Sequence, residues 1–120
     1  MDVNTIQMAK WRRAKELNIE LLDTTVKSGI PAFAPTWNLV MDHKQDKISD
    51  EVYIEKYRKL MQDSFMVNQF VWIETMRKPH IAIACYCHPD RFCHRHLLVK
   101  FFESVCQAKG IPFRYLGEIE

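Results

Sequence analysis

Glycine is scarce in this sequence, with three residues among 120. Folds built only from β-strands use glycine at many tight turns, so its scarcity favours a fold that contains helices. No stretch approaches the roughly 18 apolar residues of a membrane-spanning helix, so we predict no membrane segment. Residues 1–18 are charged and lack the apolar run of a signal peptide, and we therefore expect a cytoplasmic protein.

The chain also lacks a strong excess of charge. Its formal net charge of +2 does not by itself indicate a nucleic-acid-binding protein. Basic side chains gather in two segments, Lys10 to Lys15 and Arg91 to Lys100, and either segment could be an ordinary solvated face. Hydrophobic residues make up 48% of the chain, which is enough for one core. We therefore predict a single domain over residues 1–120.

A framework of disulfides is not expected from the cysteines. The four are Cys85, Cys87, Cys93 and Cys106, and the first three lie within nine residues of one another. Such crowding in a cytosolic chain indicates metal binding, thiol chemistry or a packed strand.

The pattern of apolar residues in the first half of the chain predicts helices around one strand. Ile6, Trp11 and Leu17 recur at roughly helical spacing among charges, which predicts an amphipathic helix over residues 1–18. Residues 18–26 suit a buried strand because their apolar run ends in β-branched residues. Residues 32–41 are expected to form a short strand or an ordered loop. Ser49 is the predicted N-cap of a helix, and a second helix is expected over residues 68–77.

The second half predicts a strand, a helix and a strand in that order. Residues 80–87 are continuously apolar, as in a central strand that is covered on both faces. Asp90 is a good N-cap for a helix over residues 91–109, which Gly110 would end. A last strand is expected over residues 113–116. This order implies a parallel crossover, and we predict a three-layer α/β fold with a mostly parallel sheet of about four strands flanked by helices.

The candidate site lies where the strand at residues 80–87 turns into the following helix. Residues 85–96 read CYCHPDRFCHRH. Ligands of open α/β sheets bind at the carboxyl ends of strands, and a helix N-terminus there attracts anions. Arg91 and Arg95 add positive charge, so we predict an anion-binding pocket. Cys93, near the helix start, is a candidate thiolate, and His94 could carry a proton.

Three other interpretations of these residues stay open. The cysteines could simply pack in the core as small apolar side chains. The spacing from Cys85 to Arg91 matches the loop of cysteine phosphatases, but that loop needs small residues where this chain has a proline and an aspartate. Zinc could be bound by Cys85, Cys87, Cys93 and His88, which are suitable donors in an unusual spacing.

Several pieces of the chain together resemble the DUF488 family, to which no reaction is assigned. The pieces are Leu21-Leu22-Asp23, Phe33-Ala34-Pro35-Thr36-Trp37, Tyr53 to Met61, Ile83-Ala84-Cys85 and Cys93-His94-Arg95. The resemblance spans residues 19–116 and implies a compact α/β fold with a pocket at Asp23, Cys85 and the Cys-His-Arg triplet. Thr25 stands where many members have arginine, and Cys87 where many have an acidic residue.

We therefore expect a DUF488-like protein, and interpret it as a small enzyme for a phosphorylated, nucleotide-like or nucleic-acid substrate. The expected catalytic residues are Cys93 or Cys85 as nucleophile, His94 as proton carrier and Asp23 as orienting group or base. Arg95 and Arg91 are the expected anion ligands. No cofactor is predicted. The alternatives are a non-catalytic module that binds nucleotide or nucleic acid, and a zinc-stabilised structural protein.

Overall fold

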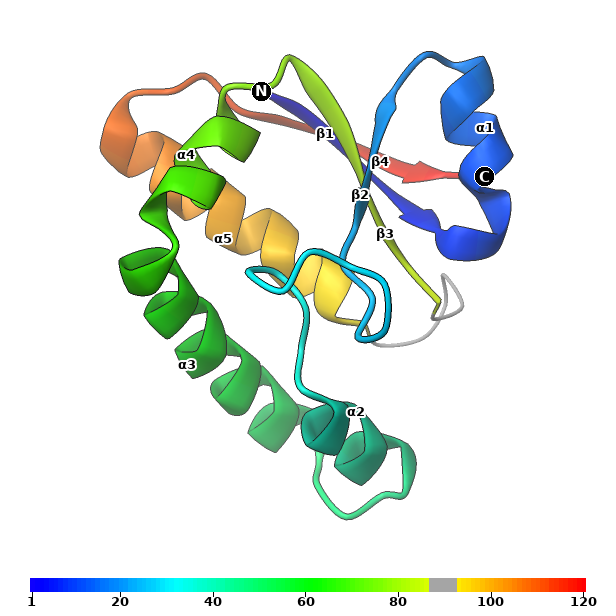
Figure 1. The fold of residues 1–120 in the computed structure, drawn as a ribbon, viewed down its shortest axis with the longest axis vertical. Helices are drawn as coiled ribbons and strands as arrows, with labels where there is room; N and C mark the ends of the chain where they lie inside the picture. Colours follow the sequence, from blue (N-terminus) through cyan, green and yellow to red (C-terminus); the bar gives the residue numbers. More distant parts are fainter. Residues whose placement is uncertain (87–92) are drawn as a thin grey trace.

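Four parallel strands form the centre of the fold. The computed structural model describes residues 1–86 and 93–120 (Figure 1). The strands lie in the order β2-β3-β1-β4, and every neighbouring pair is parallel. Their bounds are β1 Asp2–Gln7, β2 Glu20–Asp23, β3 His80–Cys85 and β4 Arg114–Ile119. The predicted α/β fold with a mostly parallel sheet is therefore confirmed.

The start of the chain corrects the predicted N-terminal helix over residues 1–18. Residues 2–7 form β1, which lies between β3 and β4, and only the short η1 (Met8–Lys10) and α1 (Trp11–Glu16) that follow are helical. Val3, Thr5 and Ile6 are fully buried and β-branched, which suits a pleated strand covered on both faces. The helical spacing of Ile6, Trp11 and Leu17 was therefore coincidental.

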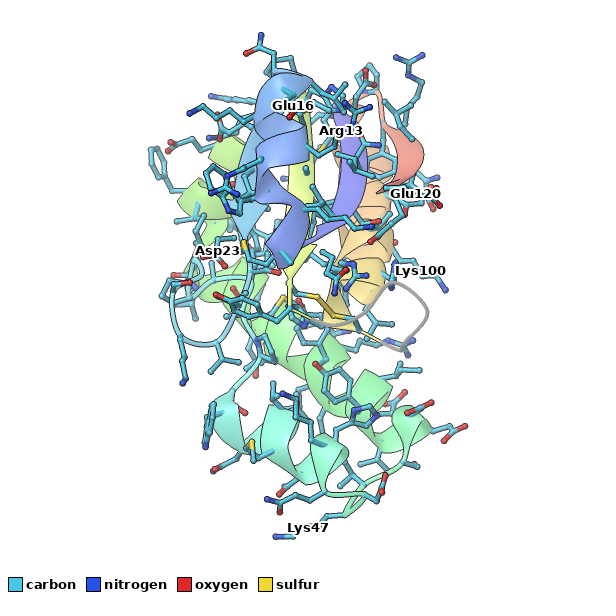
Figure 2. All side chains as sticks on the ribbon, turned by 90° about the vertical axis from the view of Figure 1, so that its right-hand side faces the viewer. Arg13, Glu16, Asp23, Lys47, Lys100 and Glu120 are labelled. Atoms are coloured by element: carbon cyan, nitrogen blue, oxygen red, sulfur yellow. A yellow bond between two sulfur atoms is a disulfide. The ribbon has the colours of Figure 1, made fainter. Side chains whose placement is uncertain are left out.

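Helices cover the two faces of the sheet unequally (Figure 1). α1 packs on one face through Ala14, against a small cluster that includes Ile6 and Ala84. A larger cluster on the other face joins the sheet to the remaining helices, which are α2 (Trp37–Lys44), α3 (Asp50–Val67), α4 (Gln69–Met76) and α5 (His94–Lys109). Figure 2 shows α1 in front of the strands, opposite this thicker layer. The three-layer arrangement follows from these two unequal cores.

The apolar run at the end of β3 serves both cores. Ile81 and Ile83 point into the larger cluster, while Ala82 and Ala84 point into the smaller one under α1. Successive side chains of a strand point to opposite faces, so a strand between two helical layers needs apolar residues at every position. The large and small residues on the two faces match the thick and thin helical layers.

Side-chain caps fix the starts of two helices. Ser49 accepts a hydrogen bond from Val52 N at 3.2 Å at the start of α3, as predicted. Thr36 accepts one from Leu39 N at 3.1 Å and begins α2. Residues 37–44 are therefore helical. The prediction of a strand or ordered loop over residues 32–41 agrees with the structure only for residues 32–36, which form a loop. No helix within the described residues is long and apolar enough to cross a membrane.

The connections that follow β1 and β3 leave the sheet on opposite faces. The chain leaves β1 through α1 on one face and leaves β3 through α5 on the other. β1 and β3 are neighbours, and Gln7 at the end of β1 pairs with Cys85 at the end of β3. Adjacent strands whose connections leave on opposite faces open a crevice at their carboxyl ends, where α/β proteins bind ligands.

Two neighbouring phenylalanines of α5 test this packing. Phe102 is fully buried, with its ring centroid 5.4 Å from that of Phe33 and 5.2 Å from that of Trp72, whereas Phe101 is half-buried. Phe102→Ala should lower the free energy of unfolding by about 3–5 kcal/mol because it leaves a core cavity, and Phe101→Ala should cost clearly less. Urea denaturation measures both. We predict a single domain, so each variant should unfold in one transition, and equal losses would contradict the observed helix register.

Candidate functional site

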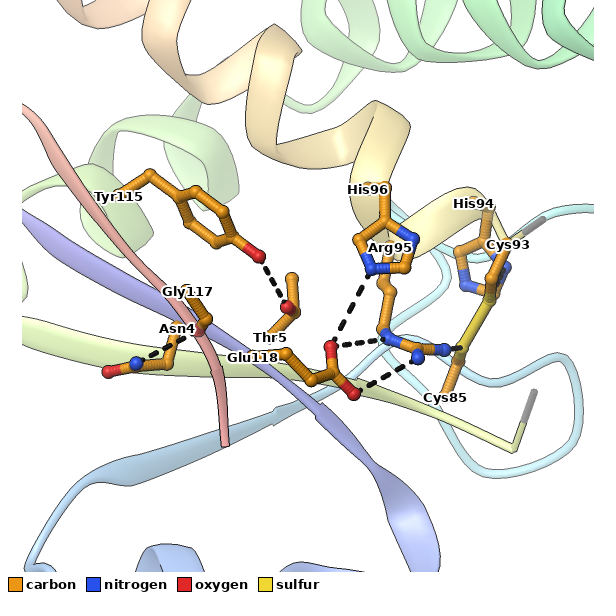
Figure 3. Close-up of polar contacts among 10 residues, drawn as sticks. All are labelled: Asn4, Thr5, Cys85, Cys93, His94, Arg95, His96, Tyr115, Gly117 and Glu118. Carbon is orange, nitrogen blue, oxygen red and sulfur yellow. Dashed lines mark hydrogen bonds and ion pairs between the residues drawn. A yellow bond between two sulfur atoms is a disulfide. The ribbon is translucent and has the colours of Figure 1, made fainter. Parts of the chain in front are cut away.

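Cys85 and Cys93 meet at the carboxyl end of β3 (Figure 3). Cys85 is the last residue of the strand and Cys93 is the N-cap of α5. Their sulfur atoms are joined as a disulfide, and the two residues are 1% and 3% exposed. The predicted meeting of strand end and helix start is therefore present, in a form closed to solvent.

The backbone of Cys93 explains how three consecutive residues reach one place. Residues two positions apart in a regular helix point about 200° away from each other. Cys93 and Arg95 could therefore not both face Cys85 from a helical turn. Cys93 is extended, with φ −151° and ψ 147°, and α5 begins only at His94. The helix predicted over residues 91–109 is thus first observed at residue 94. Cys93 precedes its first turn.

Thr24 holds the imidazole of His94. The His94 Nε2 atom lies 2.9 Å from the Thr24 carbonyl oxygen and 3.0 Å from Thr24 Oγ1. Thr24 Oγ1 already donates its proton to the Ala84 carbonyl oxygen at 2.9 Å, so both Thr24 oxygens accept from the ring. Nε2 therefore carries the ring proton, and Nδ1 is left with a free lone pair. Nδ1 lies 3.7 Å from Cys93 Sγ.

The surroundings of His94 keep its ring neutral. Burial lowers the pKa of His94 to about 4, and the positive charge of Arg95 acts in the same direction, although the hydrogen bond to Thr24 opposes both. The ring of Tyr57 lies beside it, with centroids 5.6 Å apart. A neutral imidazole with an unprotonated Nδ1 can accept a hydrogen bond from the neighbouring thiol.

Arg95 is fully buried and links three elements (Figure 3). Its Nε and Nη2 atoms donate to the two carboxylate oxygens of Glu118 at 3.2 and 3.1 Å. Its Nη1 atom donates to Cys85 Sγ at 2.8 Å. The guanidinium thus joins α5 to β4 and to the end of β3. Nothing in the sequence pattern indicated Glu118, which lies on β4, 23 residues after Arg95.

Glu118 is the acidic centre of this cluster. Burial alone would raise its pKa, but hydrogen bonds from Thr5 and Arg95, with the charges of Arg95 and His96, bring the pKa below its usual value. His96 Nε2 lies 3.6 Å from a Glu118 oxygen. Glu118 is therefore ionised near neutral pH and offsets the charge of Arg95.

Asp23 ends β2 next to the cluster but turns to its own loop. Its carboxylate accepts hydrogen bonds from Thr25 N, Thr25 Oγ1 and Ser28 Oγ, at 2.9, 2.7 and 2.7 Å. Burial raises its pKa, but these bonds outweigh that effect and lower it. The orienting contact to His94 that we predicted for Asp23 is made by Thr24 instead. A role of Asp23 as base stays a prediction.

The other predicted site residues, Cys87, His88 and Arg91, lie outside the described residues. Cys106 is buried in the larger core, away from the site. The structure thus brings together Cys85, Cys93, His94 and Arg95 of the predicted set. Among the described residues, the sulfurs of Cys85 and Cys93 and a ring nitrogen of His94 lie within 4.8 Å of one another, close enough to share a metal ion.

Comparison with known proteins identifies one family. The family model DUF488-N3a, described as the active DUF488-N3 subclade, matches residues 5–105. That stretch includes Cys85 and the triplet from Cys93 to Arg95 and ends before β4, so Glu118 lies outside it. No curated protein and no solved structure matches the chain.

The ion pair between Arg95 and Glu118 should support the stability of the site. Glu118→Gln leaves a fully buried guanidinium without its counter-charge and should lower the free energy of unfolding by about 3 kcal/mol. Glu55→Gln is the control, because the Glu55–Arg58 pair is exposed and its loss should cost under about 1 kcal/mol. Denaturant melts of both variants measure the difference, and equal, small losses would contradict it.

Proposed function

Given that the chain belongs to the DUF488 family, we propose that its cysteine–histidine–arginine cluster is the active site of a small thiol-dependent enzyme. The proposed substrate is a phosphorylated or nucleotide-like molecule, or a nucleic acid. Cys93 is the proposed nucleophile and His94 carries its proton. Cys85 is the second thiol of the site.

The observation that carries this proposal is the lone pair of His94 Nδ1 beside Cys93 Sγ, at 3.7 Å. In the reduced protein the thiol proton passes from Sγ to Nδ1, and the thiolate forms a bond to an electrophilic carbon or phosphorus of the substrate. The bond from that atom to the leaving group breaks as the imidazolium gives the group its proton, and water then cleaves the covalent intermediate and restores the thiol. Cys93 also stands at the N-cap position of a helix of 16 residues, whose N-terminal dipole favours the thiolate.

Arg95 acts on the second thiol in this proposal. Its Nη1 donates to Cys85 Sγ at 2.8 Å, and a cationic donor favours the thiolate form of a cysteine. The disulfide between Cys85 and Cys93 contains no nucleophile, so the proposed enzyme works in the reduced state. A cytoplasmic location, which we also propose, would supply that state.

Anion binding needs groups whose charge is not already offset. Glu118 accepts from two nitrogens of Arg95, so Arg95 would bind a substrate anion only if the substrate displaced Glu118. We therefore assign the first contact with the anion to Arg91 and to the backbone N–H groups at the start of α5.

A binding module without chemistry is the second candidate, and the burial of both sulfurs favours it. Cys85 and Cys93 are 1% and 3% exposed, whereas a nucleophile must be reached by its substrate. In that case the cluster would only shape a nucleotide or nucleic-acid site. The two functions differ in the reactivity of the reduced thiols.

Thiol reactivity tests the proposed function. Reduced protein should react with iodoacetamide at Cys93 about tenfold or more faster than at Cys106, because burial raises the pKa of Cys106 while Cys93 has an adjacent base. Mass spectrometry of peptides over a time course measures both rates in one sample. His94→Ala should lower the alkylation rate of Cys93 and leave the alkylation rate of Cys106 unchanged.

Cys106→Ser is the matched control for this experiment, since it removes a buried cysteine of the larger core. It should keep the fast reaction of Cys93. Equal rates at Cys93 and Cys106 in the folded wild-type protein, or an unchanged Cys93 rate in a folded His94→Ala variant, would favour the binding module.

Ligand-dependent melting tests the proposed substrate class. Inorganic phosphate, a nucleoside monophosphate and a single-stranded oligonucleotide should each be added to reduced protein, and a ligand that binds the folded state raises the melting temperature. Arg91→Ala should abolish the shift, while Arg114→Ala, on the exposed opposite end of β4, should retain it. The absence of any shift would contradict an anionic substrate.

A further inference from the structure

We propose that reduced Cys85 and Cys93, together with His94, bind a thiophilic divalent metal ion of the Zn²⁺ class. The two sulfurs and the ring nitrogen lie within 4.8 Å of one another, and all three residues are buried. Two thiolates and one imidazole form a donor set that zinc prefers, and three protein ligands leave a fourth position open.

The separation of two donors fits a tetrahedral ion. Bonds of about 2.3 Å to sulfur and 2.0–2.1 Å to nitrogen place these two donors about 3.6 Å apart in a tetrahedron. Cys93 Sγ and His94 Nδ1 are 3.7 Å apart. The neighbouring residues therefore present one edge of such a site.

The imidazole is oriented as in metal sites. A histidine that ligates a metal through one nitrogen commonly donates the N–H of the other to a backbone carbonyl or carboxylate. His94 Nε2 donates to the Thr24 carbonyl oxygen, at 2.9 Å, and this contact directs the lone pair of Nδ1 towards Cys93. The second contact, to Thr24 Oγ1, holds the ring in the same orientation.

The charge of the metal-bound site fits a divalent cation. Glu118 pairs with Arg95, so two thiolates would bring an uncompensated charge of about −2 into a buried place. One divalent ion cancels it. The N–H from Arg95 Nη1 to Cys85 Sγ can persist, since a bound thiolate still accepts hydrogen bonds.

The spacing of the two backbones also suits a shared ion. The Cα atoms of Cys85 and Cys93 are 7.8 Å apart, beyond the range of about 4.4–6.8 Å usual for disulfides. Two thiolates on one zinc ion keep their sulfurs about 3.8 Å apart. This set differs from the one predicted from sequence, because His94 takes the place of His88 and because Cys87 lies outside the described residues.

The proposed site does not depend on the proposed enzymatic function. An ion on both sulfurs removes the nucleophile, so metal-bound and reactive states exclude each other. Zinc should therefore protect Cys93 from iodoacetamide. Alkylation of metal-free protein tests the function alone, and metal titration of the same protein tests the site alone.

Cobalt serves as the spectroscopic probe. Untagged protein, reduced and freed of metal by chelation, should bind one equivalent of Co²⁺. Binding should produce thiolate-to-cobalt charge-transfer absorption and the visible bands of a tetrahedral ion, and Zn²⁺ should displace the cobalt. Cys85→Ser and Cys93→Ser should each weaken the charge-transfer band and lower affinity at least about tenfold, as expected for loss of a ligand. Cys106→Ser should behave as wild type.

The wild-type chain supplies a test that is independent of variant folding. Diamide removes two electrons and two protons from the thiol pair, and the resulting disulfide should bind no Co²⁺ until a thiol reductant restores binding. Absence of the charge-transfer band in reduced wild-type protein would overturn the proposal. Equal cobalt binding by the oxidised protein, or full binding by both folded serine variants, would also overturn it.

Discussion

The buried guanidinium of Arg95 is the constraint around which the site is organised. It is 0% exposed, donates to both oxygens of Glu118 and reaches Cys85 Sγ with its third nitrogen. A charge so far from water is tolerated only with a partner that fills its hydrogen bonds. The end of β3, the start of α5 and the end of β4 are therefore fixed relative to one another, and Cys93 and His94 are positioned as a consequence.

The sequence predicted correctly those elements whose local residue pattern is compatible with one kind of secondary structure only. Residues 81–84 are apolar at every position because both faces of β3 are covered. Ser49 is a residue type preferred at the N-cap of a helix, and it caps α3. β1 was missed for the opposite reason. The six residues of β1 contain one charge, Asp2, and fit a helix or a strand, and only β3 and β4, far along the chain, decide between them.

The same division applies to the site. Cys85, Cys93, His94 and Arg95 could be found because they are close in sequence and lie at a strand-to-helix junction, where parallel sheets place ligands. Thr24 and Glu118 could not, since each is an ordinary polar residue whose importance comes from a tertiary contact. Family membership covers Thr24 but not Glu118, so the counter-charge of the site belongs to the part of the chain beyond the matched region.

The central place of β1 has a consequence for how the chain folds. Asp2 pairs with His80 on one side and with Arg114 on the other, so both neighbours of β1 are made long after it during synthesis. The apolar side chains of β1 are buried only after these strands have been made, and most of the sheet forms through contacts distant in sequence. Such contacts slow folding because a long loop is closed before any pairing compensates for it. Until β3 leaves the ribosome β1 has no partner strand, and its other edge stays open until β4 follows; such open edges favour aggregation during folding.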